Sequence, residues 1–427
     1  MKILLKNVRP YHAGAQTLDI LVHDGLIARM EPNIQADNSV EMRDFNGAFV
    51  SPGWMDVGPQ CGDPGYEHRE DLFSAAAAAA AGGFTALAPA PNTHPAVHSK
   101  SEVLYIRHKT AGLTTQFFPL GAISHNLEGK DLAELMDMRE AGAVAFTDGD
   151  KPVQDAGLLL RALLYAKAFG GLIFNTPHHK SVAAGGQMHE GRVSAMLGMP
   201  GIPAIAETLM VQRDLSLLEY TDSRLHLHLI STAESVELVR QAKAKGLHVT
   251  CSVALLNLCF TDDPETRGLG LRMEDGFDTS WKVKPPLRSE KDRFALLEGL
   301  RDGTIDFIST QHSPWDEEAK NLEFPYAEFG VTMLETAYAV YNAFLSAEMP
   351  LELWVEKIAL APRRVLGLPA PELKIGAPAE LSIFDPQATW TYARGKMRSK
   401  SFNSPFLGRE MKGKVLGVLN GGKAAWY

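Results

Sequence analysis

Cysteine is scarce in this chain of 427 residues, which holds only Cys61, Cys251 and Cys259. Three thiols cannot build a disulfide framework, and their spacing does not match a zinc finger. Such a sequence suits a reducing compartment, and we expect a cytoplasmic protein. Cys61 is expected to pack as a small apolar side chain, because nothing in its sequence context indicates a lowered thiol pKa.

Long apolar runs are missing too. The opening segment MKILLKNVRP has too few apolar residues between its lysines for a signal peptide. The alanine run 75–81 is weakly apolar and ends at Gly82 and Gly83, so it predicts a packed helix followed by a strand. We therefore expect neither a membrane span nor a membrane partner.

Positive charge is nowhere concentrated. Lysine and arginine number 42 against 51 aspartates and glutamates, which gives a net charge of −9 at pH 7. Nucleic acids and anionic membranes bind basic patches, and the nearest candidate, ARGKMRSK, is short. We expect no nucleic-acid partner. The sequence also has no G-x-S-x-G, Walker loop or dinucleotide fingerprint, so these other catalytic classes have no support.

Short apolar runs alternate with amphipathic stretches from residue 52 to residue 370, as where FTALAPA precedes SEVLYIRHKTAG. Glycine follows many of these stretches and supplies a left-handed helix cap. The capping glycines are Gly112, Gly142, Gly170, Gly246 and Gly303. Repeated strand–helix units over this length predict an α/β fold, a (β/α)8 TIM barrel.

Both ends of the chain have the character of β-strands instead. Residues 1–51 alternate short apolar runs with turns, including a hairpin signal at His23-Asp24-Gly25. Residues 371–427 return to this pattern in AELSIFDPQATWTY and KGKVLGVLNGGKAAWY. We predict that the two ends form one small composite β domain beside a barrel of residues 52–370.

The segment PGWMDVGPQCGDPGYE, residues 52–67, reads as a buried strand that runs into a loop. In a barrel enzyme, the loop after such a strand carries chemistry. Between Asp56 and Asp63, however, the loop has no histidine and no charge. A strand built like an active-site strand thus offers no group for a reaction.

Several motifs in a fixed order make the sequence similar to dihydroorotases of the metal-dependent amidohydrolase superfamily. They include PGWMDV, GGFTALAPAPNTHPAV, AVAFTDGDKPVQDAG, KVKPPLRSEKDRFALLEGLRDGTIDFISTQHSP and SKSFNSPFLGREMKGKV, and the resemblance runs from end to end. It implies a (β/α)8 barrel that converts carbamoyl aspartate and dihydroorotate in pyrimidine synthesis, with zinc at the C-terminal mouth.

The resemblance also implies where the zinc ligands stand, and most of these positions have lost them. The changed positions are Gly58 and Gln60 in the H-x-H, Thr176 (Asn175 if the register shifts by one) and Leu229 for the single histidines, and Gln311 for the aspartate that serves as base. Asp148 is retained, although the family's D-D-G reads D-G-D here. Zinc needs three or four imidazole, thiolate or carboxylate donors, so we predict that no catalytic set is intact and that the family zinc is absent, leaving no cofactor.

The substrate positions that the resemblance implies are depleted as well. Gly62 and Trp315 replace an arginine and a histidine, and Lys284 replaces the asparagine of N-P-P-L-R. Asn92 and Lys284 are therefore the remnant of a substrate-binding site. We expect Leu229 and Trp315 to fill the vacated volume and to close the pocket.

Further histidines are expected near the same mouth, at His178, His179, His226, His228 and His312. The pair at 226 and 228 shares one face of a strand, which allows a relocated metal site, but we favour packing or hydrogen bonding with neighbours. The pair at 178 and 179 reads as part of a loop.

Asp148 leaves two readings open as well, a remnant of the metal site or an N-cap and turn residue.

These observations predict a non-catalytic dihydroorotase homologue with a structural or regulatory role. The resemblance implies aspartate transcarbamoylase as a partner, because dihydroorotases associate with that enzyme and inactive homologues act as scaffolds for it. We also expect a homo-oligomer. Two alternatives stay open: an amidohydrolase with a rebuilt or metal-free site, and a binding protein that holds a small anion with Asn92, Lys284 and Arg288.

Overall fold

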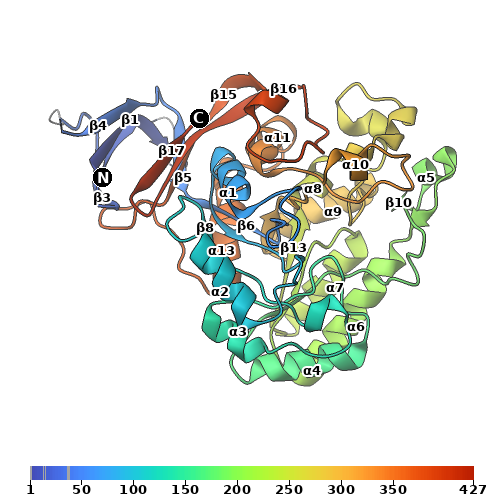
Figure 1. Ribbon diagram of the computed structural model, residues 1–427. Helices are drawn as coiled ribbons and strands as arrows, with labels where there is room; N and C mark the ends of the chain where they lie inside the picture. Colours follow the sequence, from blue (N-terminus) through green and yellow to red (C-terminus); the bar gives the residue numbers. More distant parts are fainter. Residues whose placement is uncertain (1, 13, 15, 36–38) are drawn as a thin grey trace.

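The computed structural model describes residues 2–12, 14, 16–35 and 39–427, which form two adjoining parts (Figure 1). One part is a β sheet to which both ends of the chain contribute, and the two termini lie within it (Figure 1). The other part is the barrel, with its helices around the outside. The predicted (β/α)8 barrel with a composite β domain is confirmed in outline, and the boundaries at residues 51/52 and 370/371 stay predictions.

Eight strands form the sheet, in the order β17-β16-β15-β5-β1-β2-β3, with β4 pairing with β1. Their bounds are Lys2–Pro10 (β1), Leu18–His23 (β2), Leu26–Glu31 (β3), Glu41–Asp44 (β4), Phe49–Pro52 (β5), Leu381–Thr391 (β15), Glu410–Asn420 (β16) and Lys423–Trp426 (β17). Antiparallel pairing of β15 with β5, which sets Leu381 opposite Pro52, joins the two ends of the chain. The predicted hairpin is confirmed, because His23 pairs with Leu26 across a two-residue turn.

The barrel strands run parallel in two groups, β6-β7-β8 and β14-β13-β12-β9. Their bounds are Trp54–Val57 (β6), Phe84–Ala88 (β7), Gln116–Phe117 (β8), Ile173–Asn175 (β9), Leu225–Leu227 (β12), Val249–Ala254 (β13) and Phe307–Ser309 (β14). The segment around Phe146 links the groups through single bridges to Gly121 and Ile173, rather than through a regular strand.

Side chains help to close the barrel between its first and last strands. The Ser309 hydroxyl donates a hydrogen bond to the Val57 carbonyl over 2.9 Å. The Thr310 amide donates to the buried Asp56 carboxylate over 2.8 Å. Asp56, the polar residue in the first barrel strand, therefore helps to join the first and last strands of the barrel, and it does not line the mouth.

The helices of the barrel part are bounded as follows: α1 Leu72–Ala81, α2 Lys100–Lys109, α3 Leu135–Ala141, α4 Ala156–Lys167, α6 Ile205–Thr221, α7 Ala233–Ala244, α8 Leu255–Cys259, α9 Glu290–Arg301, α11 Ala337–Phe344, α12 Leu351–Val355 and α13 Ala361–Leu366. The short elements β10 (Met188–His189), α5 (Arg192–Leu197), β11 (Gly201–Ile202) and α10 (Glu317–Lys320) belong to long loops. The alanine run forms α1, as predicted, and most of its alanines are buried. Among the described residues, no helix has both the length and the apolar character to cross a membrane.

A buried arginine ties the barrel to the sheet. Arg363 on α13 is 2% exposed and forms an ion pair with Glu380, just before β15. The same carboxylate accepts a hydrogen bond of 2.7 Å from the Thr85 hydroxyl on β7. One carboxylate thus connects a barrel strand, a barrel helix and the composite sheet.

We expect Arg363→Met to lower the free energy of unfolding by about 3–5 kcal/mol, because it leaves a partly buried carboxylate without its cation. The matched control is Arg364→Met in the same helix, whose exposed pair with Glu356 should cost about 1 kcal/mol or less. Urea unfolding of both variants measures the difference, and equal losses would contradict this role for Arg363.

Candidate functional site

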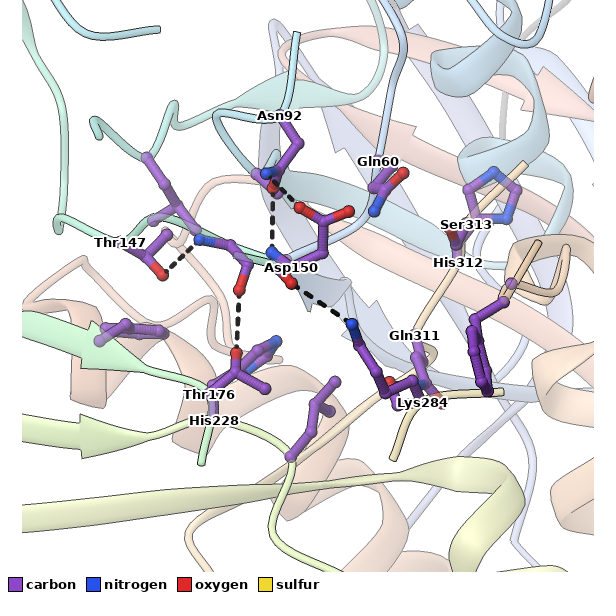
Figure 2. Close-up of a pocket in the computed structure, with 18 of the residues that line it drawn as sticks. Gln60, Asn92, Thr147, Asp150, Thr176, His228, Lys284, Gln311, His312 and Ser313 are labelled. Atoms are coloured by element: carbon purple, nitrogen blue, oxygen red, sulfur yellow. Dashed lines mark hydrogen bonds between the residues drawn. The ribbon is translucent and has the colours of Figure 1, made fainter. Parts of the chain in front are cut away.

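The C-terminal ends of the barrel strands surround a cavity of about 130 Å³ (Figure 2). A water molecule needs about 10–15 Å³ of such space, so several waters or one small molecule fit. The predicted site residues on its wall are Gly58, Gln60, Asn92, Thr176, Leu229, Lys284, Gln311 and Trp315. The prediction that Leu229 and Trp315 close the pocket is wrong, because both form its wall and the cavity persists.

Three strand ends turn with a left-handed backbone at positions where the resemblance implies metal ligands. The φ angles are +86° at Gly58, +59° at Leu229 and +58° at Gln311. Glycine accepts this conformation freely, whereas a leucine or a glutamine in it stores about 1–3 kcal/mol of strain. Serine hydroxyls support both turns, since the Leu229 and Gln311 amides each donate over 3.1 Å to Ser252 and Ser309.

The two candidates for the third histidine position, Asn175 and Thr176, point in different directions at the end of β9. Asn175 is buried, and its amide donates over 2.7 Å to the Asp214 carboxylate. Thr176 lines the cavity and donates its hydroxyl to the Gly149 carbonyl over 3.2 Å. Thr176 is therefore the residue that faces the mouth.

Asp148 is 2% exposed, and its carboxylate is occupied by the neighbouring loop. It accepts hydrogen bonds of 2.9 Å from the Ile123 and Ser124 amides and one of 2.5 Å from the Ser124 hydroxyl. Burial raises the pKa of Asp148, and these hydrogen bonds oppose that rise. Of the two readings left open by the sequence, the structure favours a turn residue, since Gly149 and Asp150 line the cavity and Asp148 does not.

Asn92, Asp150 and Lys284 meet at the centre of the site (Figure 2). The Asn92 amide donates over 2.5 Å to the Asp150 carboxylate, and the Lys284 ammonium reaches the Asp150 carbonyl over 3.5 Å. Sequence reasoning missed Asp150, because the scrambled D-G-D motif gave no reason to prefer its second aspartate. Lys284 forms no ion pair among the described residues, so its charge is available to the cavity.

Gly62 and Trp315, the other positions where the resemblance implies substrate anchors, are occupied by structural contacts. A Cβ added at Gly62 would collide with the Glu70 carbonyl, so no side chain fits there. The Trp315 indole donates to the Phe329 carbonyl over 3.0 Å and stacks on the Arg69 guanidinium 3.8 Å from the ring centre. Neither position offers an anchor for a substrate.

Only one of the two polar groups of the Gln311 side chain has a hydrogen-bond partner. Its side-chain nitrogen donates to the Lys284 carbonyl, while its side-chain oxygen is buried without a hydrogen-bond partner. Next to it, His312 is 1% exposed and lies in the cavity wall, with Nδ1 accepting from the Met333 amide over 3.2 Å. Sequence reasoning expected His312 near the mouth, and the structure places it there.

His226 and His228 belong to one buried hydrogen-bonded chain. Nδ1 of His226 lies 2.8 Å from the Thr250 hydroxyl, and Nε2 lies 3.1 Å from the Ser252 hydroxyl. Nδ1 of His228 lies 2.9 Å from the same Ser252 oxygen. The His226 ring also stacks on Phe307 with centroids 4.8 Å apart. The structure favours packing and hydrogen bonding over a relocated metal site for this pair.

The other candidate residues near the mouth turn away from it. His178 and His179 lie in an irregular segment after β9, as predicted, and burial with the charge of Lys284 lowers the pKa of His178 to about 4. Arg288 is buried, 3.7 Å from the Glu207 carboxylate, and donates to the Ile202 carbonyl over 2.8 Å. It is therefore committed to the loops rather than to a ligand.

The comparisons with known proteins agree with this architecture. Residues 47–235 match the family described as dihydro-orotase-like. A dihydroorotase of Pelotomaculum thermopropionicum is 42% identical over 99% of this chain and 98% of its own length. A dihydroorotase of Geobacter metallireducens is 38% identical over the whole of both chains. This chain belongs to the dihydroorotase family.

Solved structures of related hydrolases have the same fold. The L-hydantoinase (dihydropyrimidinase) of Arthrobacter aurescens aligns with a TM-score of 0.82 at 26% identity, covering 99% of this chain and 95% of that one. A D-hydantoinase, 21% identical with a TM-score of 0.78, is similar in fold alone. The predicted barrel with its β domain is thus confirmed.

The donor set at the mouth does not fit the zinc of the dihydroorotase family. In the part of the chain that the structure describes, no three histidine, cysteine, aspartate or glutamate side chains gather where they could hold a metal ion. Gln60 and Gln311 on the cavity wall carry neutral amides, which are poor zinc ligands, and the histidines and carboxylates on the wall do not gather into a set of three. The prediction that zinc is absent rests on this chemistry and stays a prediction.

Burial lowers the pKa of His228 to about 3, and it lowers that of His226 well below its usual value. An unfolded histidine titrates near 6.5, so the unfolded chain binds more protons than the folded chain below that pH. We expect stability to fall as the pH drops from about 6.5 towards 4, by up to about 1.4 kcal/mol per pH unit for each of these histidines.

The variant His228→Gln should make this dependence less steep, because it removes one of the protons taken up on unfolding. His108→Gln, on the exposed side of α2, is the control for losing a histidine. Urea unfolding between pH 7.5 and 5 measures both, and an unchanged slope in His228→Gln would contradict the buried, neutral state of His228.

Proposed function

We propose that this member of the dihydroorotase family is not a catalyst and that it has a structural or regulatory role in pyrimidine biosynthesis. One observation carries the proposal. The ligand positions Gly58, Gln60, Thr176, Leu229 and Gln311 all lie on the cavity wall, and none presents an imidazole or a carboxylate. The chain has kept the shape of the mouth and has lost its metal-binding groups.

Hydrolysis of a cyclic amide needs an activated water and a base to take its proton. Gln311 stands where the resemblance places that base, and a neutral amide cannot accept a proton at physiological pH. Its nitrogen is also bound to the Lys284 carbonyl. Gln311 therefore supplies no base, and the residues at the implied ligand positions hold no metal that could activate a water.

The partner in this proposal is aspartate transcarbamoylase, in the cytoplasm, with this chain as a homo-oligomer. A barrel keeps its stability in its core and at its N-terminal face, so its outer surface can serve assembly after the mouth has lost its chemistry. The residues of the ion pair from Arg363 to Glu380 do not line the cavity, which supports a fold whose stability does not depend on activity.

We expect the protein, purified without chelators, to hold no stoichiometric zinc and to hydrolyse no dihydroorotate above a blank, with or without added zinc. Losing the base alone typically costs about 10²–10⁴-fold in rate, and losing the metal-bound water costs more. Gln311→Asp alone should not restore turnover, because no activated water is present for it to deprotonate.

Elemental analysis and a spectrophotometric assay of dihydroorotate test this expectation together. One zinc per chain, or turnover by the native sequence that His228→Gln abolishes, would replace the proposal by the rebuilt-site hydrolase.

A second candidate function is the binding of a small anion, and it is favoured by a cavity whose wall carries Lys284, which forms no ion pair among the described residues. Asn92 and Arg288, the other residues expected to contribute, are bound to Asp150 and Glu207. Only one cation, Lys284, therefore remains to bind an anion, and anion binding is the weaker of the two candidate functions.

We expect the protein to co-purify with aspartate transcarbamoylase from its host, in a complex that survives Lys284→Ala and Asn92→Ala. A stable interface would bury about 1,200–2,000 Å² of surface away from the mouth, so changes in the cavity leave it intact. Size-exclusion chromatography with light scattering measures the complex. Absence of a complex, together with a growth defect from Lys284→Ala, would favour the anion-binding function.

A further inference from the structure

His228 points across the barrel at the place where the first residue of the family's H-x-H stands. A Cβ added at Gly58 would lie 2.5 Å from Nε2 of His228 and 3.1 Å from its Cε1. Real Cβ atoms do not approach other atoms so closely, so the ring occupies the space that any side chain at residue 58 requires. Gly58 is thus more than a lost ligand, because its missing side chain admits the ring of His228.

We propose that the ring of His228, packed against Gly58, links the ends of β12 and β6 across the mouth and sterically excludes a metal-binding side chain from residue 58. This inference rests on the proposed function and deepens it. The mouth then not only lacks metal ligands but also has a side chain packed into the space that one of them would need. It follows that restoring a ligand at residue 58 requires a second change at residue 228.

The ring of His228 is not free to swing away from Gly58. Its Nδ1 is bound to the Ser252 hydroxyl over 2.9 Å, and the Leu229 amide donates to the same oxygen over 3.1 Å. The left-handed turn at Leu229, φ +59°, fixes the backbone directly after the histidine. The ring is therefore held from its far side by β13, and its Nε2 edge faces Gly58.

A second glycine on the cavity wall shows the same arrangement. A Cβ added at Gly149 would collide with the side-chain oxygen of Asn92, which accepts a hydrogen bond from the Asp150 amide over 3.3 Å. Asn92 thus fills the space at residue 149 as His228 fills the space at residue 58. Two independent places at the mouth are occupied by a neighbour's side chain.

Gly246 provides the matched control for a test. Its φ of +84° is close to the +86° of Gly58, but nothing lies within 4 Å of a Cβ added there. Replacement by alanine therefore imposes the same backbone strain at both positions, and only Gly58→Ala also meets the ring of His228.

The experiment is a double-mutant cycle on the full-length protein, with Gly58→Ala, His228→Ala and the double variant, read as melting temperature at one scan rate. We expect Gly58→Ala to lower the melting temperature by about 3 °C or more beyond Gly246→Ala, and the double variant to lie above the sum of the two single shifts. If Gly58→Ala does not fold alone, folding of the double variant supports this link. Additive shifts, or equal effects of the two alanine changes, overturn it.

Zinc affinity provides the second readout. We compare Gly58→His/Gln60→His/Gln311→Asp with the same variant carrying His228→Ala, by titration with zinc alone. The proposal expects at least about tenfold tighter binding without His228, because three restored donors suffice only if the space is open. Equal affinity, or no binding in either variant, overturns the steric part. Turnover by the native protein would overturn the proposed function and leave the coupling result unaffected, so the two failures are distinguishable.

Discussion

The hydroxyl of Ser252 is the point on which the arrangement of the mouth depends. It lies within hydrogen-bond distance of Nε2 of His226, Nδ1 of His228 and the Leu229 amide. Burial lowers the pKa of both histidines, and the Ser252 contacts orient their rings and stabilise the left-handed turn after them. Because the turn at Leu229 would otherwise be strained, the serine and the buried histidines are coupled, and the ring of His228 is held against Gly58.

The contacts that stabilise the barrel are different from the contacts that shape its mouth. Strand closure at Asp56 and Thr310, the buried Arg363 and the packed alanines of α1 make no use of the cavity. Substitutions at the mouth therefore cost the fold little, provided that the strand ends keep their turns and that no buried polar group loses its partners. This separation allows a chain to share about two-fifths of its residues with a dihydroorotase along its whole length while the residues at its mouth differ in chemistry from the zinc ligands that the resemblance implies.

The sequence predicted the location of the site better than the orientation of its parts. The strand–helix alternation fixed the fold class, and motif order placed Gly58, Gln60 and Gln311 on one cavity wall. It did not predict that Asp148 turns towards Ser124 while Asp150 faces the cavity, because a one-residue change of direction in a loop leaves no periodic signal. The prediction of a closed pocket failed for a related reason, since the size of a side chain does not say where it points.

The amino-acid sequence by itself determined the two-part fold, the burial of the alanine helix and the identity of the groups at the mouth. Periodicity and residue chemistry carry that information, because strands, helices and metal donors are recognised locally. Only the tertiary structure decided that His226 and His228 form a hydrogen-bonded chain instead of a metal site. Only the tertiary structure also decided that His228 fills the space at Gly58. The hydrogen bonds of the two histidines join neighbouring strands, and the approach of His228 to Gly58 joins strand ends far apart in the sequence. Both depend on the tertiary structure and on the backbone turn at Leu229, which no short stretch of sequence specifies.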